Sequence, residues 1–132
     1  MIHEVTVATA TQVELREVTD EIQQQINKSG IKEGLAILFV PHTTAAVTIN
    51  ENADPDVATD MVKGLNDLVP MQNRYRHAEG NSAAHIKSSL IGASEQVIIR
   101  NGKLLLGTWQ GIYFCEFDGP RTRKLQIKLI EG

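Results

Sequence analysis

Hydrophobic and polar residues alternate in several short segments of this 132-residue chain and follow a helical spacing in others. Apolar side chains at every second position are typical of strands with one buried face, and spacings of three or four positions are typical of amphipathic helices. By these rules, strands are predicted at residues 2–8, 12–18, 35–40, 43–49, 96–100, 103–109, 113–117 and 124–130. Helices are predicted to begin at the capping residues Thr19, Asp54 and Ser82.

Turn and breaker residues support this division. The Asn101-Gly102 pair between two predicted strands is a strong hairpin signal. Pro55 directly after Asp54 suits the first helical position, where a missing N–H costs nothing. Pro70 is expected to end this helix. The residues that repeat at helical spacing along it, and that we expect to face the core, are Val57, Met61, Leu65 and Leu68.

The order of these elements indicates the fold class. The strands come mostly in consecutive runs, which favours an α+β fold over a doubly wound α/β fold. We expect a mixed or antiparallel β-sandwich of about seven or eight strands with two or three flanking helices. The length suits one domain, residues 1–132, and no linker, internal repeat or low-complexity segment interrupts it.

Composition narrows the possible functions. With 42% hydrophobic residues the chain can build a compact core, and its net charge of -3 excludes the basic footprint of nonspecific nucleic-acid binding. No apolar stretch approaches the roughly 20 residues of a membrane span. Cys115 is the only cysteine, so no intrachain disulfide can form. Because the first residues lack the pattern of a signal peptide, we expect a cytoplasmic protein that does not bind membranes.

Three of the four histidines, His42, His77 and His85, lie in mostly polar, turn-adjacent segments in the middle of the chain. Neutral imidazoles from separate elements can hold a divalent metal such as zinc, and magnesium is a second candidate. Histidines can also act as general acids or bases near neutral pH. The spacing matches no compact zinc motif. Their alternative role is that of exposed or hydrogen-bonded structural residues.

Further polar residues complete the candidate site. We predict catalytic roles for His42, Glu51 and His85, and a metal site at His42, His77 and His85. Glu51 lies between a strand and a helix and can bind metal, act as a base or pair with an arginine. The predicted substrate-binding residues are Thr43, Thr44, Asn50, Asn81, Gln110, Arg121 and Arg123.

Each of these residue types also has a structural explanation. Threonine is common in strands, and asparagine is common in turns. Asn81 precedes a predicted helix N-terminus, where backbone N–H groups can hold a phosphate. Arg121 and Arg123 can bind a phosphate bidentately, pair with Glu116 and Asp118, or lie on a solvated charged hairpin.

Two further residues, Trp109 and Cys115, are expected to be buried in a core or an interface. Trp109 is expected in the core or in an interface, as is usual for tryptophan. Cys115 alternates in register with Phe117 and is expected to face the core, which argues against a catalytic thiol.

Three separate motifs resemble motifs of the YjbQ-like family and follow one another in the same order as in that family. The resemblance runs over essentially the whole chain. They are residues 41–57 (PHTTAAVTINENADPDV), 84–87 (AHIK) and 106–119 (LGTWQGIYFCEFDG). Only Met71–Arg74 matches no pattern that we can assign.

The resemblance implies a small cytoplasmic homotrimer with a mixed β-sandwich and flanking helices. It also implies a weak, secondary thiamine-phosphate synthase activity. We therefore expect an enzyme that acts on a small phosphorylated molecule. The alternative is a non-catalytic trimeric module that binds a metal or a metabolite.

Overall fold

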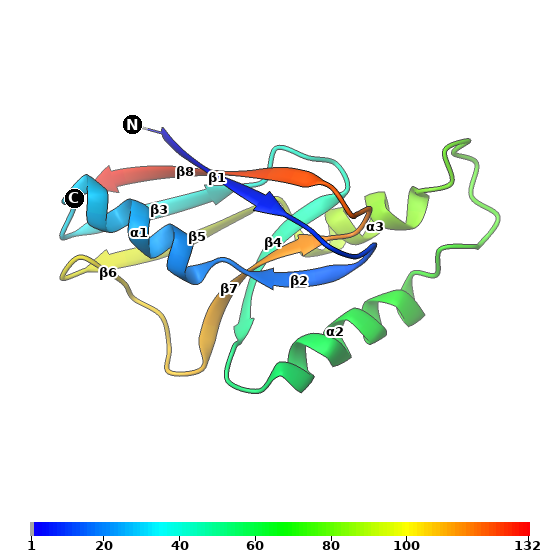
Figure 1. Cartoon of the computed structure of the whole chain (residues 1–132), viewed down its shortest axis with the longest axis horizontal. Helices are drawn as coiled ribbons and strands as arrows, with labels where there is room; N and C mark the ends of the chain where they lie inside the picture. The colour runs from blue at the N-terminus through cyan, green and yellow to red at the C-terminus, as the bar shows by residue number, and fades with distance from the viewer. Residues whose placement is uncertain (1) are drawn as a thin grey trace.

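The computed structural model describes residues 2–132 and has the predicted α+β fold, with eight strands and three helices (Figure 1). The elements are β1 (Ile2–Ala8), β2 (Glu14–Glu17), α1 (Thr19–Ser29), β3 (Gly34–Phe39), β4 (Ala45–Glu51), α2 (Pro55–Leu68), α3 (Ser82–Ile91), β5 (Ser94–Arg100), β6 (Lys103–Leu104), β7 (Gln110–Glu116) and β8 (Thr122–Glu131).

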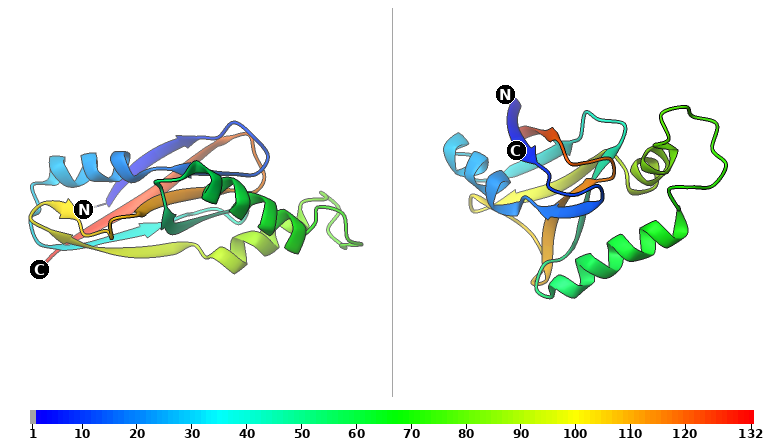
Figure 2. Two further views of the ribbon diagram at one scale, coloured as in Figure 1. Left: turned by 90° about the horizontal axis from the view of Figure 1, so that it is seen from below. Right: turned by 45° about the vertical axis from the view of Figure 1, so that its right-hand side comes forward.

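The strands form two antiparallel sheets. The larger sheet has the order β1-β8-β3-β5-β6, and the smaller has the order β2-β7-β4. The main core lies between them, and α1 adds Ile22 and Ile26, which have no exposed surface. Helix α1 lies toward the same end of the molecule as the C-terminus, and α3 lies toward the opposite end (Figures 1 and 2).

A second, smaller core lies on the other face of the three-stranded sheet. Its fully buried members are Ala46, Ala84, Cys115 and Phe117. Helix α3 packs over this face against β4, so the prediction that Cys115 faces a core is confirmed.

Helix α2 corrects one prediction. Asp54 caps it as expected, because its Oδ1 accepts a hydrogen bond of 2.9 Å from the Asp56 N–H, and Pro55 takes a first-turn position. However, α2 has no fully buried residue, and Leu68 is 70% exposed although it was expected to face the core. The helical spacing identified an apolar face correctly, but the described chain covers that face only in part.

The outer face of the five-stranded sheet is also apolar. In the register of the sheet, Leu35 lies opposite Ile98 on one side and Ile130 on the other. Ile98 and Ile130 are 54% and 42% exposed, and Phe39, on the same face, is 46% exposed. Ile37 lies between Leu35 and Phe39 along β3. We call the five residues together the outer apolar face: Leu35, Ile37, Phe39, Ile98 and Ile130.

Several element boundaries differ from the predictions. Of the strand predicted at 103–109, only Lys103–Leu104 is a strand in the structure. Trp109 lies in a turn and is 63% exposed, so it is not a core residue of this chain. Val18 and Asn81, rather than Thr19 and Ser82, occupy the N-cap positions of α1 and α3, and neither makes a side-chain capping hydrogen bond. The cause at α1 is tertiary, because the Thr19 hydroxyl accepts a hydrogen bond from Ile112 N–H and donates to Glu17.

Among residues 2–132 no helix combines the length and the apolar character needed to cross a bilayer.

Candidate functional site

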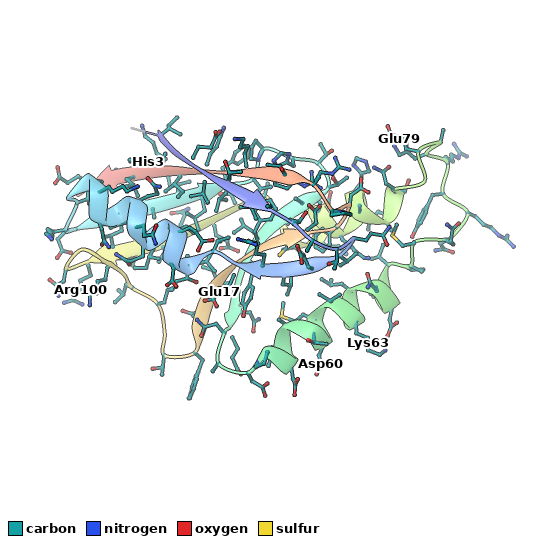
Figure 3. All side chains as sticks on the ribbon, in the orientation of Figure 1. His3, Glu17, Asp60, Lys63, Glu79 and Arg100 are labelled. Carbon is teal, nitrogen blue, oxygen red and sulfur yellow. The ribbon has the colours of Figure 1, made fainter. Side chains whose placement is uncertain are left out.

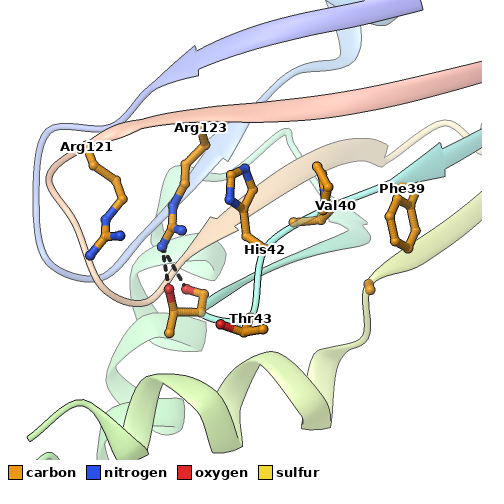
Figure 4. Close-up of a pocket in the computed structure, with 9 residues that line it drawn as sticks. Phe39, Val40, His42, Thr43, Arg121 and Arg123 are labelled. Carbon is orange, nitrogen blue, oxygen red and sulfur yellow. Dashed lines mark hydrogen bonds between the residues drawn. The ribbon is translucent and has the colours of Figure 1, made fainter. Parts of the chain in front are cut away.

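An open pocket of about 520 Å³ lies where the β3–β4 connection meets the start of β8 (Figure 4). The antiparallel pairing of β3 with β8 brings these distant segments together, since Phe39 lies opposite Gln126. The pocket therefore combines an apolar wall with cationic and polar groups. The lining residues are Phe39, Val40, Pro41, His42, Thr43, Thr44, Ala93, Arg121 and Arg123.

His42 is held in one tautomer. Its Nε2 accepts a hydrogen bond of 3.0 Å from the backbone N–H of Lys124, so Nε2 is unprotonated and Nδ1 carries the ring proton. Burial, and then the charge of Arg123, lower the pKa of His42 below its ordinary value. The ring is thus neutral at pH 7 and offers an N–H donor. Because Nε2 is occupied, this geometry suits hydrogen-bond donation better than metal ligation or general base catalysis.

Arg123 is anchored by a buried carboxylate. Its Nε lies 2.9 Å from Oε1 of Glu116 and its Nη2 lies 2.5 Å from Oε2, while both side chains are almost completely buried. Nη2 also donates to the Thr44 hydroxyl at 2.8 Å. The proposed pairing with a carboxylate is therefore confirmed, and a solvated hairpin is wrong for this pair. The hydroxyl of Thr44 serves to hold the arginine in place.

Glu116 keeps its charge in this buried position. Burial by itself would raise the pKa of its carboxyl, but hydrogen bonds from Arg123, the Asp118 amide and the Thr9 hydroxyl outweigh it and hold the pKa below the usual range. The guanidinium of Arg123 and the carboxylate of Glu116 thus form a fixed, buried ion pair beneath the pocket.

Arg121 forms the exposed cationic rim of the pocket. Its Nη2 lies 3.1 Å from Oδ2 of Asp118, and its Nε donates to the Asp118 carbonyl at 2.9 Å, while the side chain stays 48% exposed. Asn81 joins this rim, because its Nδ2 donates to the same Asp118 carboxylate at 2.9 Å. The single Asp118 carboxylate therefore positions both Arg121 and Asn81.

His77 and His85 line a different pocket, of about 340 Å³, together with Ser82 and Ile86. Their rings meet edge to face with centroids 5.5 Å apart. His42 lies in the first pocket, so one chain does not bring the three predicted histidines together. Among residues 2–132 no three His, Cys, Asp or Glu side chains are grouped so that they could hold a metal ion. The residues present therefore do not fit the metal site expected at His42, His77 and His85.

Glu51, Asn50 and Gln110 lie at the far end of β4. Asn50 and Glu51 are five and six residues beyond Ala45, which corresponds to roughly 20 Å along a strand. Their polar groups have local partners: Asn50 accepts from Glu51 N–H at 2.7 Å, and Gln110 Oε1 accepts from Gly107 N–H at 2.8 Å. Within one chain, Glu51 and His42 therefore cannot act on the same substrate atom.

This far end is closely packed around a glycine. A Cβ on Gly111 would lie 2.6 Å from Glu17 Oε2 and 2.7 Å from Asn52 Cβ. Asn52 Nδ2 in turn donates to Glu17 at 2.8 Å. The glycine beside Gln110 is thus explained by close packing.

The sequence interpretation missed one buried charged residue. Lys87 in α3 has no exposed surface, and burial lowers the pKa of its ammonium group. Its helical spacing from Ala83 and Ala84, which face the same side, is the signal that could have identified it.

Comparison with known proteins places this fold and these motifs in a family. A family model described as UPF0047 protein YjbQ-like matches residues 3–132. The chain belongs to this family. It is 50% identical over 131 residues to the UPF0047 protein YugU of Bacillus subtilis, and the aligned region covers 98% of this chain and 99% of the relative. A UPF0047 protein of Methanocaldococcus jannaschii is 51% identical over 130 residues, covering 98% of this chain and 94% of the relative.

Solved structures agree with the assignment. A conserved uncharacterized protein of Clostridium acetobutylicum has a TM-score of 0.95 at 52% identity, covering 97% of this chain and 99% of that one. A protein of unknown function from Sulfolobus solfataricus has a TM-score of 0.95 at 33% identity, covering 100% of this chain and 97% of that one. These family members are described without an activity, so the comparisons establish family and fold.

Proposed function

We propose that this protein is an enzyme that binds a small phosphorylated metabolite in the pocket at His42. The observation that carries the proposal is that Arg121, Arg123 and the neutral His42 line one pocket. Guanidinium groups recognise phosphate oxygens with charge-assisted hydrogen bonds, and the Nδ1–H of His42 supplies a further donor. The half-exposed Arg121 is the principal phosphate contact.

The opposite wall of the pocket suits the organic part of such a ligand. Phe39, Val40 and Pro41 present apolar surface beside the cationic groups. A combination of apolar wall and a few polar groups is typical of small-molecule sites. The proposed ligand is therefore a phosphate ester with an apolar or aromatic body.

The family resemblance adds a specific reaction to this proposal. Thiamine-phosphate synthesis joins a thiazole phosphate to a pyrimidine pyrophosphate and releases pyrophosphate. Fixed cationic groups that stabilise the departing pyrophosphate would accelerate it, and Arg121 and Arg123 are available for this role. We propose a weak activity of this kind, secondary to another reaction. Arg121 and Arg123 take this role in the proposal, because residues 2–132 offer no three-ligand set for a protein-bound metal.

A second candidate function is a non-catalytic metabolite-binding module. It is favoured by one observation: Nε2 of His42 is occupied by the Lys124 amide, and Glu51 is remote, so the pocket lacks a free general base within one chain. In both versions the working unit is a homotrimer. The exposed residues of the outer apolar face, such as Ile98 and Ile130, support an assembly that covers them. A cytoplasmic location is also part of the proposal, supported by the single, buried Cys115.

Binding and turnover measured on the same sample distinguish these functions. Isothermal titration calorimetry with phenyl phosphate and inorganic phosphate tests whether the pocket binds phosphate. Release of pyrophosphate from the two thiamine precursors tests whether the protein catalyses the reaction. Binding with turnover supports the enzyme, and binding without turnover supports the module. Absence of binding to either phosphate compound at millimolar concentration rejects both.

A further inference from the structure

Lys87 occupies an unusual position between two helices. It belongs to α3 and has no exposed surface, and its Nζ donates to Oδ1 of Asn66 in α2 at 2.5 Å. None of the ion pairs within residues 2–132 involves Lys87. A buried lysine that serves only the fold is usually paired with a carboxylate. Here the recorded partner is one neutral amide oxygen.

These surroundings favour the neutral amine over the ammonium ion. A buried cation with a single neutral acceptor leaves two N–H donors and a full charge without compensation. The neutral amine carries no charge and has fewer N–H groups that need hydrogen-bond acceptors, and it keeps a lone pair. Burial accordingly lowers the pKa of Lys87, whereas the Asp67 carboxylate raises the pKa of the exposed Lys63. Lys63 lies on the exposed side of α2 (Figure 3).

The amine lies only one side chain below the surface. Asn66, its partner, is itself exposed. Helix α2 has no fully buried residue, which makes a small displacement of the helix inexpensive. Reaching Nζ therefore requires displacement of the Asn66 side chain or of α2, and not unfolding of the sheets.

We propose that Lys87 is a carbonyl-reactive amine that forms an imine with small aldehydes or ketones entering beside Asn66. The Nζ lone pair attacks the carbonyl carbon, and proton transfers turn the carbonyl oxygen into a leaving water molecule. A C=N bond replaces the C=O bond with no change in oxidation state. Desolvated lysines are the ones that proteins use for this chemistry. The site is separate from the phosphate pocket and does not depend on the function proposed there.

Reductive trapping on the native protein tests the proposal. Acetaldehyde supplies the carbonyl group, cyanoborohydride supplies the hydride that fixes the imine, and peptide mass spectrometry measures ethylation at each lysine at pH 7.5. We expect Lys87 to react several times faster than Lys63, because burial lowers the pKa of Lys87 whereas Asp67 raises the pKa of Lys63. Equal or slower reaction at Lys87 overturns the proposal. In denatured protein the two lysines should react alike, which controls for peptide detection.

Two substitutions of the same residue sharpen the test. Asn66→Ala removes the covering side chain and should accelerate ethylation of Lys87 severalfold. Asn66→Asp has nearly the same size but adds a carboxylate, which favours the ammonium and should slow ethylation. If both variants, folded by circular dichroism, react at Lys87 like the native protein, the proposed role of the neutral amine beside Asn66 is wrong.

Discussion

The backbone N–H of Lys124 donates a hydrogen bond to Nε2 of His42 across 3.0 Å and so links β8 to the β3–β4 connection. This one contact fixes which ring nitrogen carries the proton. With Nε2 accepting this bond and Nδ1 protonated, neither ring nitrogen offers a free lone pair in this tautomer. If Nε2 were protonated, its N–H would point at the Lys124 N–H, and two donors cannot form a hydrogen bond. This contact therefore disfavours the charged form of the His42 ring.

Stability should therefore fall in acid partly through His42. Its folded-state pKa lies below the ordinary value of 6.5, so the unfolded chain takes up the proton first. This contribution is complete above pH 6.5 and is lost as pH falls below it. Urea unfolding at pH 8 and pH 5 should show a larger loss of stability for the wild type than for His42→Gln. A difference between the two proteins that stays constant, or grows in favour of the wild type in acid, would contradict this.

Breaking the ion pair beneath the pocket should be costly. Arg123→Met leaves the Glu116 carboxylate buried without its main partner, and such changes typically cost about 3–5 kcal/mol. Adding Glu116→Gln removes the unpaired buried charge and should restore part of the lost free energy of unfolding. Chemical denaturation of the single and double variants measures this. Lys63→Met breaks the exposed pair with Asp67 and serves as a control with little expected effect. A double variant less stable than Arg123→Met alone would exclude this account.

The outer apolar face should control assembly. Ile98→Glu places a charge on the most exposed isoleucine of this face and should convert a trimer of 14.6 kDa chains into smaller species in light scattering after size exclusion. Gln24→Glu, on the exposed side of α1, adds the same charge elsewhere and should leave the mass unchanged. A wild-type protein that is monomeric at micromolar concentration would reject the trimer.

Local signals predicted the parts of this fold that depend on local energies. The Asn101-Gly102 pair forms the expected turn, since both residues have positive φ angles and Arg100 pairs with Lys103 across it. Asp54 caps α2 for an equally local reason. The length of β6 was not predictable in this way, because β6 ends at Leu104 although β5 continues back to Ser94. The chain then turns, and the Gln110 side chain accepts a hydrogen bond from Gly107 N–H there.

The candidate site was predictable only in part for the same reason. Arg123 and Glu116 meet because β7 and β8 lie in different sheets joined by a turn, which residue types alone do not specify. His42 and His85 have similar sequence contexts, yet the β3–β8 pairing brings only His42 to the arginines. The proximity of polar residues in sequence was thus a poor guide to their proximity in space.

Phosphate recognition by Arg121 is the central claim, and the affinity of one variant tests it most directly. Isothermal titration with phenyl phosphate should show binding to the wild type that Arg121→Met weakens about tenfold or more, since a charge-assisted contact typically contributes about 1.5–3 kcal/mol. Arg100→Met, which removes an exposed arginine on β5, should bind like the wild type. Equal affinity of Arg121→Met and the wild type would contradict the assignment of this pocket.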